Sequence, residues 1–247
     1  MHWDLWGPAS VKSLNGNHYV AAQIDDVTRQ TKLYFQEKKS QTFDSYKKDE
    51  ALIENQTGKH IKISCFNQGG EFLSTQMINH QDQKGTQQEL TVHDSPPQNG
   101  VAEAGMRTRA KWARALLLSS DLPCFLWEEA MKHTTWLQDH TPAQALNGET
   151  PYKMGNKKKP HLAGIQKFGA AAYIKDLTAR KLNAWAKKGC FVGYNSESKG
   201  YRIYWPEKRS ITVERNIIFN QDDINTCDNN AIIYGKVLLW LMNNKEV

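Results

Sequence analysis

Residues 60–72 read HIKISCFNQGGEF, and this stretch decides the fold class of the first half of the chain. Its first part, 60–65, is a short apolar run that predicts a strand, and it leads directly into a loop with two glycines at 67–70. Amphipathic helices are expected on either side, over 40–56 and 71–83. This alternation of helix and strand predicts an α/β layer with a mixed sheet.

The neighbouring segments extend the same pattern. Runs rich in Val, Ile, Tyr and Phe predict strands at 18–25, 31–37 and 87–92, and helical periodicity predicts helices over 101–118 and 123–140. For the helix over 40–56 we expect Ser40 as the N-cap and Gly58 as the residue that ends it. Its buried stripe is expected to consist of Phe43, Tyr46, Leu52 and Ile53.

The second half of the chain changes character after a lysine-rich segment at 148–160. Short apolar runs at 165–175, 189–194, 200–205 and 210–219 then predict a small barrel or antiparallel sheet. We therefore expect an α/β domain over 1–147, a linker over 148–163 and a small β-barrel over 164–222. A tail over 223–247 matches neither pattern.

Charge is spread unevenly along the 247 residues, which carry 32 Lys and Arg against 26 Asp and Glu. Residues 101–220 hold 20 basic and 10 acidic side chains, a net charge of +10, whereas residues 1–100 have a net charge of −2. A basic excess in one half is typical of a protein with a polyanionic partner, most often nucleic acid. A solvated lysine-rich surface is the alternative.

Several classes of protein are disfavoured by the same sequence. Its longest apolar run is broken by Lys236, too soon to span a bilayer, so no membrane partner is expected. Asp4 and Pro8 interrupt the position of a signal peptide, which predicts a location in the nucleus or cytoplasm. The four cysteines include no CxxC pair, so a zinc site is not expected.

Three positions are candidates for chemistry because the predicted elements bring them to one edge of a sheet. Asp4 lies near the start of the expected first strand, Asn67 just past the strand at 60–65, and Glu103 in the first turn of a helix. Three carboxylates in these places would hold two divalent cations for phosphoryl transfer. Only two of the three residues are acids.

At these residues the sequence resembles a known family. The motifs are Asp4-Leu5-Trp6-Gly7-Pro8, Ile24-Asp25-Asp26, Gly69-Gly70-Glu71-Phe72 and Pro97-Gln98-Asn99-Gly100-Val101-Ala102-Glu103. Together they resemble the integrase core of copia-type LTR retrotransposons, which are related to retroviral integrases. The later segments Lys188-Gly189-Cys190-Phe191-Val192-Gly193-Tyr194 and Gly200-Tyr201-Arg202-Ile203-Tyr204 resemble the small Src-homology-3-like barrel that follows this core.

The resemblance implies a ribonuclease-H-like fold with a five-stranded mixed sheet and a catalytic triad of acids, with 35 residues between the last two members. Asp4 matches the first acid and Glu103 the last, and position 67 has the spacing of the second. The resemblance also implies Mg²⁺ or Mn²⁺ as cofactor, retroelement ends and target DNA as partners, a homo-oligomer, and DNA integration as the activity.

The departures from the family pattern bear on function. Asn67 replaces the central acid, and a neutral amide cannot bridge two cations as a carboxylate does. Replacement by Glu71 would need a shift of four residues and is not expected. The family's Arg after the last acid is Ala104, and only three residues precede Asp4, so we expect a truncated first strand. The sequence thus predicts an integrase-type protein without catalytic activity.

Basic residues around the third acid complete the candidate site. On the helix that contains Glu103, we expect DNA phosphates to contact Arg107, Arg109, Lys111 and Arg114. In the linker we expect them to contact Lys157, Lys158 and Lys159. A solvated helix face and an ordinary linker are the alternatives. For the whole chain, the alternatives are an active DNA strand transferase, a ribonuclease-H-type nuclease, and a domesticated non-enzymatic module that binds DNA or protein.

Overall fold

The computed structural model describes residues 1–67, 69–90, 100–175 and 185–219. Contacts divide the chain into two compact units, one made of 1–110 with 135–161 and the other of 111–134 with 162–247. The division falls inside two helices rather than in a loop. Each unit is described on its own.

The first unit is built on a mixed five-stranded sheet in the order β3-β2-β1-β4-β5. Its strands are β1 (His2–Trp6), β2 (Tyr19–Ile24), β3 (Thr31–Gln36), β4 (Ile63–Phe66) and β5 (Gln87–Leu90). The first three pair antiparallel, and β4 runs parallel to both β1 and β5. The expected first strand is present, and all five of its residues pair with β2.

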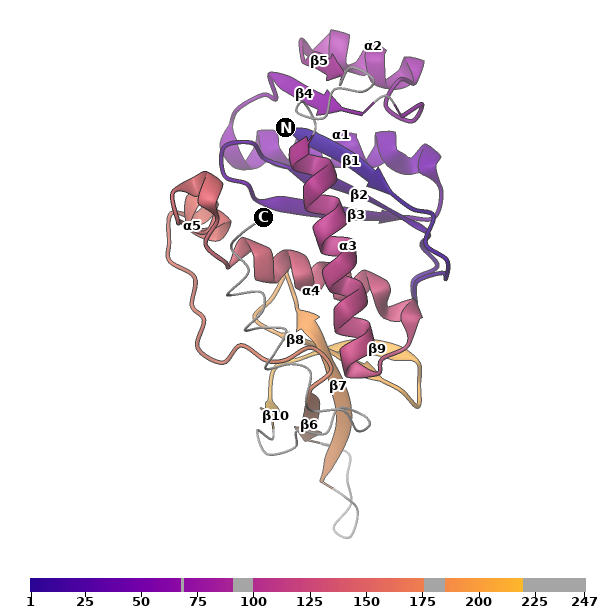
Figure 1. Cartoon of the computed structure of the whole chain (residues 1–247), viewed down its shortest axis with the longest axis vertical. Coiled ribbons are helices and arrows are strands. Elements are labelled where there is room, and N and C mark those ends of the chain that lie inside the picture. The colour runs from indigo at the N-terminus through magenta and orange to yellow at the C-terminus, as the bar shows by residue number, and fades with distance from the viewer. Residues whose placement is uncertain (68, 91–99, 176–184, 220–247) are drawn as a thin grey trace. The chain divides into compact units, whose positions relative to one another are not determined.

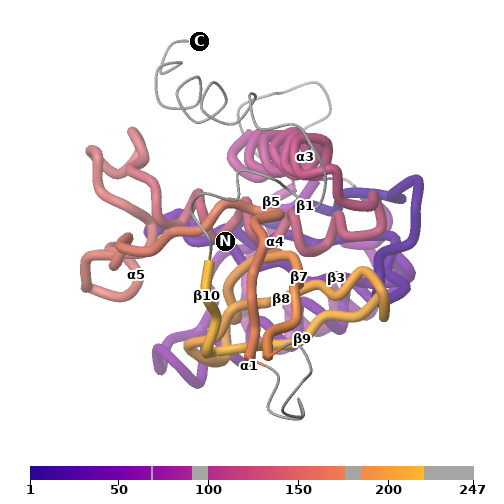
Figure 2. The backbone as a smooth tube through the Cα atoms, turned by 90° about the horizontal axis from the view of Figure 1, so that it is seen from below, coloured from indigo at the N-terminus to yellow at the C-terminus, as the bar shows by residue number. Residues whose placement is uncertain are grey.

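One face of this sheet carries the apolar core. The core cluster consists of Trp3, Ala21, Tyr46, Phe66, Phe72 and Met77. The rings of Phe66 and Phe72 lie 4.8 Å apart, and Tyr46 from α1 (Thr42–Thr57) tilts against Trp3 at 5.5 Å. The N-terminal half of α3 (Gly100–Ser120) covers the opposite face, so the two helices lie on either side of the sheet (Figures 1 and 2).

Glycines set the ends of two helices, and the one at Gly58 was predicted. Both α1 and α2 (Thr75–Lys84) end at a glycine in the left-handed region, Gly58 at φ 65° and Gly85 at φ 69°. This conformation is strained for residues with a Cβ atom. Ser74 caps α2, because its side chain accepts a hydrogen bond from the Met77 N–H.

The predicted N-cap and buried stripe of α1 are partly wrong. A short 3-10 helix η1 (Lys39–Gln41) precedes α1, so Gln41 rather than Ser40 stands at the N-cap. Leu52 is exposed, whereas Asp49 and Glu50 are buried. Residues distant in the sequence pair with one oxygen of each buried carboxylate: Lys32 and Tyr34 contact Asp49 Oδ1, and His80 contacts Glu50 Oε2 at 2.6 Å.

One of the remaining helices corresponds to the helix predicted over 123–140, and the others are short. The remaining helices are η2 (Cys124–Leu126), α4 (Trp127–Asp139), η3 (Gln144–Leu146) and α5 (Pro151–Asn156). The helix α5 lies inside the linker predicted over 148–163. It forms a helix because Thr150 accepts a hydrogen bond from the Lys153 N–H, and Pro151 fills the first helical position, where no N–H is needed.

The second unit contains an antiparallel five-stranded sheet in the order β10-β6-β7-β8-β9. Its strands are β6 (Ala171–Lys175), β7 (Ala186–Tyr194), β8 (Tyr201–Trp205), β9 (Ser210–Glu214) and β10 (Ile217–Phe219). The predicted run at 210–219 is therefore two strands, and the run at 165–175 forms a strand only from Ala171. Ala172, Phe191 and Ile203 make the centre of its core.

These two sheets confirm the predicted fold class, a ribonuclease-H-like mixed sheet with flanking helices and a second, small β domain. Among the residues that the structure describes, no helix is both long enough and apolar enough to cross a bilayer. The predicted tail at 223–247 lies outside the described residues, and the three boundaries between the four predicted segments remain predictions.

Candidate functional site

The sheet places Asp4 and Asn67 next to each other. In the parallel pair of β1 and β4, His2 lies opposite Cys65, and continuing this register by two residues sets Asp4 level with Asn67 at the end of β4. The Asn67 amide donates a hydrogen bond from Nδ2 to Oδ1 of Asp4 over 3.2 Å. Two residues 63 positions apart in the sequence thus meet at the sheet edge formed where β4 ends beside the central strand β1, as the order of elements predicted.

The Asn67 side chain is oriented by the loop that follows it. The Gly69 N–H donates to its Oδ1 over 3.1 Å, which leaves Nδ2 to face Asp4. The opposite orientation would place an NH₂ group against an N–H and an oxygen against a carboxylate, and both contacts are repulsive. The hydrogen bonds therefore determine which end of the amide faces the acid.

Asp4 itself is nearly buried, with 8% of its surface exposed. The same oxygen, Oδ1, also accepts a hydrogen bond from the Leu5 N–H over 2.9 Å. Burial raises the pKa of the Asp4 carboxyl above its ordinary value, and the charges of Glu103 and Glu71 raise it further, while the Leu5 hydrogen bond opposes the rise. The acid is thus held among like charges.

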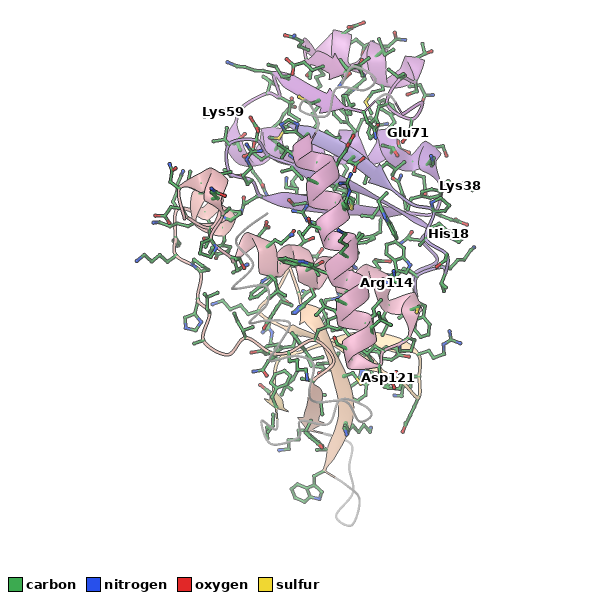
Figure 3. All side chains as sticks on the ribbon, viewed as in Figure 1. His18, Lys38, Lys59, Glu71, Arg114 and Asp121 are labelled. Carbon is green, nitrogen blue, oxygen red and sulfur yellow. The ribbon has the colours of Figure 1, made fainter. Side chains whose placement is uncertain are left out.

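Glu103 and Glu71 approach Asp4 from two different elements. Glu103 is exposed in the first turn of α3. This helix packs closely against the face of the sheet that carries Asp4: a Cβ atom added to Gly105 would lie 3.1 Å from the Ile24 side chain. Glu71 lies in the segment between β4 and α2 (Figure 3). Both act electrostatically on Asp4.

Glu71 is the residue that sequence reasoning set aside. A Cβ atom on Gly69 would come within 2.7 Å of Glu71 Oε1 and 2.9 Å of Asn67 Oδ1, so the carboxylate and the amide flank the same glycine. The Gly69-Gly70 pair before Glu71 was the available signal, since glycines allow the chain to turn a nearby side chain back toward the strand end.

The residues at this edge do not fit a two-cation centre. The described residues contain no group of three or more His, Cys, Asp and Glu side chains placed to hold a metal ion. At the central position the group that faces Asp4 is an N–H donor, which repels a cation, and the Asn67 oxygen is turned to the Gly69 N–H. We therefore derive no catalytic step through a metal.

Three other residues in or beside the sequence motifs have structural roles. Phe66 is fully buried in the core cluster of the first unit. The Cys65 thiol donates to Glu89 Oε2 over 3.3 Å, and burial, reinforced by this carboxylate, raises the pKa of Cys65 to about 11. Asp25 accepts hydrogen bonds from the backbone and hydroxyl of Thr28, which makes it a turn residue.

Most of the basic residues predicted to contact DNA are exposed. Arg107, Lys111 and Arg114 are exposed on α3, where Figure 3 labels Arg114. Arg107 belongs to the first unit and the other two to the second. The run at 157–159 is exposed directly after α5. These positions are accessible to a phosphate, which is what the prediction requires.

Arg109 departs from the prediction because its side chain is buried, with 5% of its surface exposed. Its Nη2 donates to the Thr31 hydroxyl over 2.5 Å, and burial lowers the pKa of Arg109 to about 10, while the charge of Asp139 opposes this. Arg109 therefore anchors α3 to β3 from inside the first unit and is not available to a phosphate. Helical spacing places Arg109 on the buried face of α3, between Met106 and Ala113, although its partners Thr31 and Asp139 are distant along the chain.

Comparison with known proteins adds to this geometry. A family model described as a retroviral polymerase SH3-like domain matches residues 170–231. A retrovirus-related Pol polyprotein from transposon TNT 1-94 of Nicotiana tabacum is 31% identical over 225 residues, covering 90% of this chain and 17% of that protein. One from transposon RE2 of Arabidopsis thaliana is 25% identical over 221 residues, covering 88% of this chain and 15% of that protein.

Among solved structures, the HTLV-2 integrase catalytic core domain in complex with magnesium is 15% identical, with a TM-score of 0.45, and the match covers 62% of this chain and 94% of that one. The chain spans about a sixth of the length of the curated relatives it matches. Over nearly its whole length, the chain is similar to retrovirus-related Pol polyproteins of plant transposons.

Proposed function

We propose that this chain is a retrotransposon-derived integrase-type protein that binds DNA and does not catalyse DNA strand transfer. The observation that carries the proposal is the hydrogen bond from the Asn67 amide to Asp4. It occupies the position at which the family places a second carboxylate. The nucleus or cytoplasm as its location, and assembly into a homo-oligomer, are further predictions of the resemblance.

The loss of activity follows from the chemistry of the central position. Two-metal phosphoryl transfer needs anionic oxygens that bridge or flank both cations. Asn67 offers one neutral oxygen, which already accepts the Gly69 N–H. By analogy with the loss of other electrostatic groups from active sites, we expect a rate at least about 10³-fold below that of a chain with a carboxylate at position 67.

DNA binding is proposed from charge and exposure. Residues 101–220 carry a net charge of +10, and six of the seven basic residues singled out in the sequence are exposed: Arg107, Lys111, Arg114, Lys157, Lys158 and Lys159. Exposed lysines and arginines bind phosphates without reading sequence and release counterions, so such binding weakens as salt rises. Arg109 is left out of the set because it is buried.

The two parts of the proposal are tested by two assays on the full chain. For catalysis, a labelled DNA end and a target duplex are incubated with the protein in Mg²⁺ or Mn²⁺, and we expect no strand-transfer product. Product formation by the natural chain would contradict the proposal and support an active strand transferase.

For binding, the affinity for a duplex is measured at several salt concentrations. We expect the logarithm of the affinity to fall linearly with the logarithm of salt, with a slope that reflects several phosphate contacts. A slope near zero would contradict DNA binding, whatever the result of the strand-transfer assay.

A further inference from the structure

We propose that the Asn67 carboxamide takes the place of a cation at Asp4, so that this sheet edge is complete without a metal ion. The inference deepens the proposed function and rests on it, because it treats Asp4 and Asn67 as the remains of an integrase-type site. It concerns what holds the buried acid in place, a question separate from whether the chain binds DNA.

Asp4 needs a compensating partner. It is a nearly buried carboxyl group with Glu71 and Glu103 close enough to act on it, so like charges surround it. A buried carboxylate is costly unless a cation or hydrogen-bond donors satisfy it. The described contacts to its side chain are two N–H donors, one from the Leu5 backbone and one from the Asn67 amide.

The amide is suited to this task, and a carboxylate is not. At position 67 an aspartate would accept the Gly69 N–H as Asn67 does, but it would offer Asp4 no donor. Two carboxylates about 3 Å apart repel each other unless a cation or a proton lies between them. Asn67 removes this requirement, because one amide both accepts from Gly69 and donates to Asp4.

The loop after β4 fits this arrangement closely. A Cβ atom on Gly69 would lie within 3 Å of both Asn67 Oδ1 and Glu71 Oε1. Gly69 therefore brings its own N–H up to the amide while leaving room for the Glu71 carboxylate. The loop thus holds the amide in the orientation that presents Nδ2 to Asp4.

The inference predicts how metal ions affect the chain. We titrate the 247-residue chain with Mn²⁺ and measure the concentration of free Mn²⁺ by electron paramagnetic resonance. In parallel we measure the melting temperature in EDTA and in Mn²⁺. For the natural chain we expect no specific Mn²⁺ binding at concentrations below about 1 mM, the range in which weak carboxylate sites bind divalent cations. We also expect the same melting temperature in EDTA and in Mn²⁺.

Two variants separate the roles of the amide. Asn67→Asp should melt about 3–8 °C lower than the natural chain in EDTA and recover when Mn²⁺ is added. Asn67→Ala should also melt lower in EDTA but gain nothing from Mn²⁺. The matched control is Asn55→Asp, at an exposed position on α1, and it should behave as the natural chain does.

Specific Mn²⁺ binding by the natural chain, lost on Asp4→Asn, would overturn the inference. So would an Asn67→Ala variant as stable as the natural chain, since the amide would then satisfy nothing. These results are distinguishable from failure of the proposed function. A natural chain that binds Mn²⁺ but yields no strand-transfer product refutes this inference alone, and a flat salt dependence of DNA affinity refutes DNA binding alone.

Discussion

At the scale of single residues, the structure differs most from the sequence-based predictions in the charged side chains that it buries. Arg109 and Asp139 lie inside the first unit, and parts of both side chains are buried without a hydrogen-bond partner among the described residues. Buried polar atoms of this kind usually contact ordered water. Burial raises the pKa of Asp139 to about 7, while the charge of Arg109 opposes the rise.

The raised pKa of Asp139 gives a testable pH dependence. The carboxyl titrates near about 4 in the unfolded chain, so the folded chain holds an extra proton between pH 4 and 7. The contribution of Asp139 to stability therefore rises as pH falls through this window. Asp139→Asn stays neutral, so its stability relative to the natural chain should be about 1–2 kcal/mol more favourable at pH 8 than at pH 5.5.

Urea unfolding of both chains at the two pH values measures this difference. The comparison between the variant and the natural chain cancels the other titrating groups, and any cost of leaving Arg109 without its neighbour is the same at both pH values. An equal gap at pH 8 and pH 5.5 would show that Asp139 titrates normally.

His133 in the second unit gives the opposite dependence. It is buried against the rings of Phe168 and Phe191, and burial lowers its pKa to about 4. The neutral ring is therefore favoured in the folded chain, and its contribution to stability is complete above about pH 6.5 and is lost as pH falls toward 4.

His133→Phe keeps an aromatic ring in the cluster and removes the titrating group. We expect this variant to lose less stability between pH 7 and pH 5 than the natural chain does, by about 1–2 kcal/mol. His161→Phe, at an exposed position, is the control and should retain the natural acid dependence. If both variants and the natural chain respond equally to acid, His133 is not the responsible group. Chemical unfolding across this pH range makes the comparison.

At the scale of elements, the sequence predicts what local chemistry determines. Gly58 and Gly85 were predictable helix ends, because glycine adopts the left-handed conformation there at low cost. The short helix α5 was missed, although Thr150-Pro151 is a recognisable helix start. Leu52 was misplaced because tertiary partners, Lys32 and His80, draw carboxylates of α1 inside. Such partners cannot be predicted from the helix's own periodicity.

The candidate site divides along the same line. The order of strands was enough to place Asp4 beside Asn67, since a parallel pair sets the two strand positions level. The orientation of the amide was not predictable, because it depends on the Gly69 N–H. The partner of Arg109 was also not predictable, because Thr31 lies 78 residues away.

In the second unit, one ion pair links α4 to β8. Arg202 donates to Glu129 from Nε over 2.5 Å and from Nη2 over 2.9 Å, and Glu129 is 1% exposed. Arg202→Met leaves this buried carboxylate with Lys132 as its remaining described cation, at 3.0 Å. We expect the unfolding free energy to fall by about 2–4 kcal/mol, because a buried carboxylate that loses its bidentate partner and keeps only one cation is costly.

Denaturant unfolding tests this link, with Lys199→Met as the control because Lys199 is exposed on the same unit. The control should change stability by less than about 0.5 kcal/mol. Arg202→Lys should give an intermediate loss of unfolding free energy, since lysine keeps the positive charge but cannot make the bidentate contact. A loss in Arg202→Met no larger than in the control would show that the pair contributes little.

At the scale of the whole molecule, the arrangement of charge matters more than its total. The net charge is +6, and if DNA binding depended on this total alone, any three exposed lysines would contribute equally. The proposal instead assigns part of the binding to the run at 157–159 after α5. Replacing all three lysines with Gln should lower the slope of log affinity against log salt by up to about 3, near one for each phosphate that is no longer neutralised.

The matched control has the same change in net charge elsewhere in the first unit. Lys48, Lys59 and Lys62 are exposed, and their triple replacement with Gln should leave the slope nearly unchanged. Duplex binding at several salt concentrations compares the two triple variants with the natural chain. Equal reductions in slope for both would indicate that the protein acts as a diffuse polycation without a preferred DNA-binding surface.

The central claim is that Asn67 supplies a hydrogen-bond donor where the family has a metal-binding acid. A crystal of the natural chain soaked in Mn²⁺, with an anomalous difference map calculated at the manganese edge, tests it most directly. The account predicts no manganese peak at the sheet edge and a hydrogen bond between Asn67 and Asp4. A pair of manganese ions seated between Asp4, Asn67 and Glu103 would contradict it.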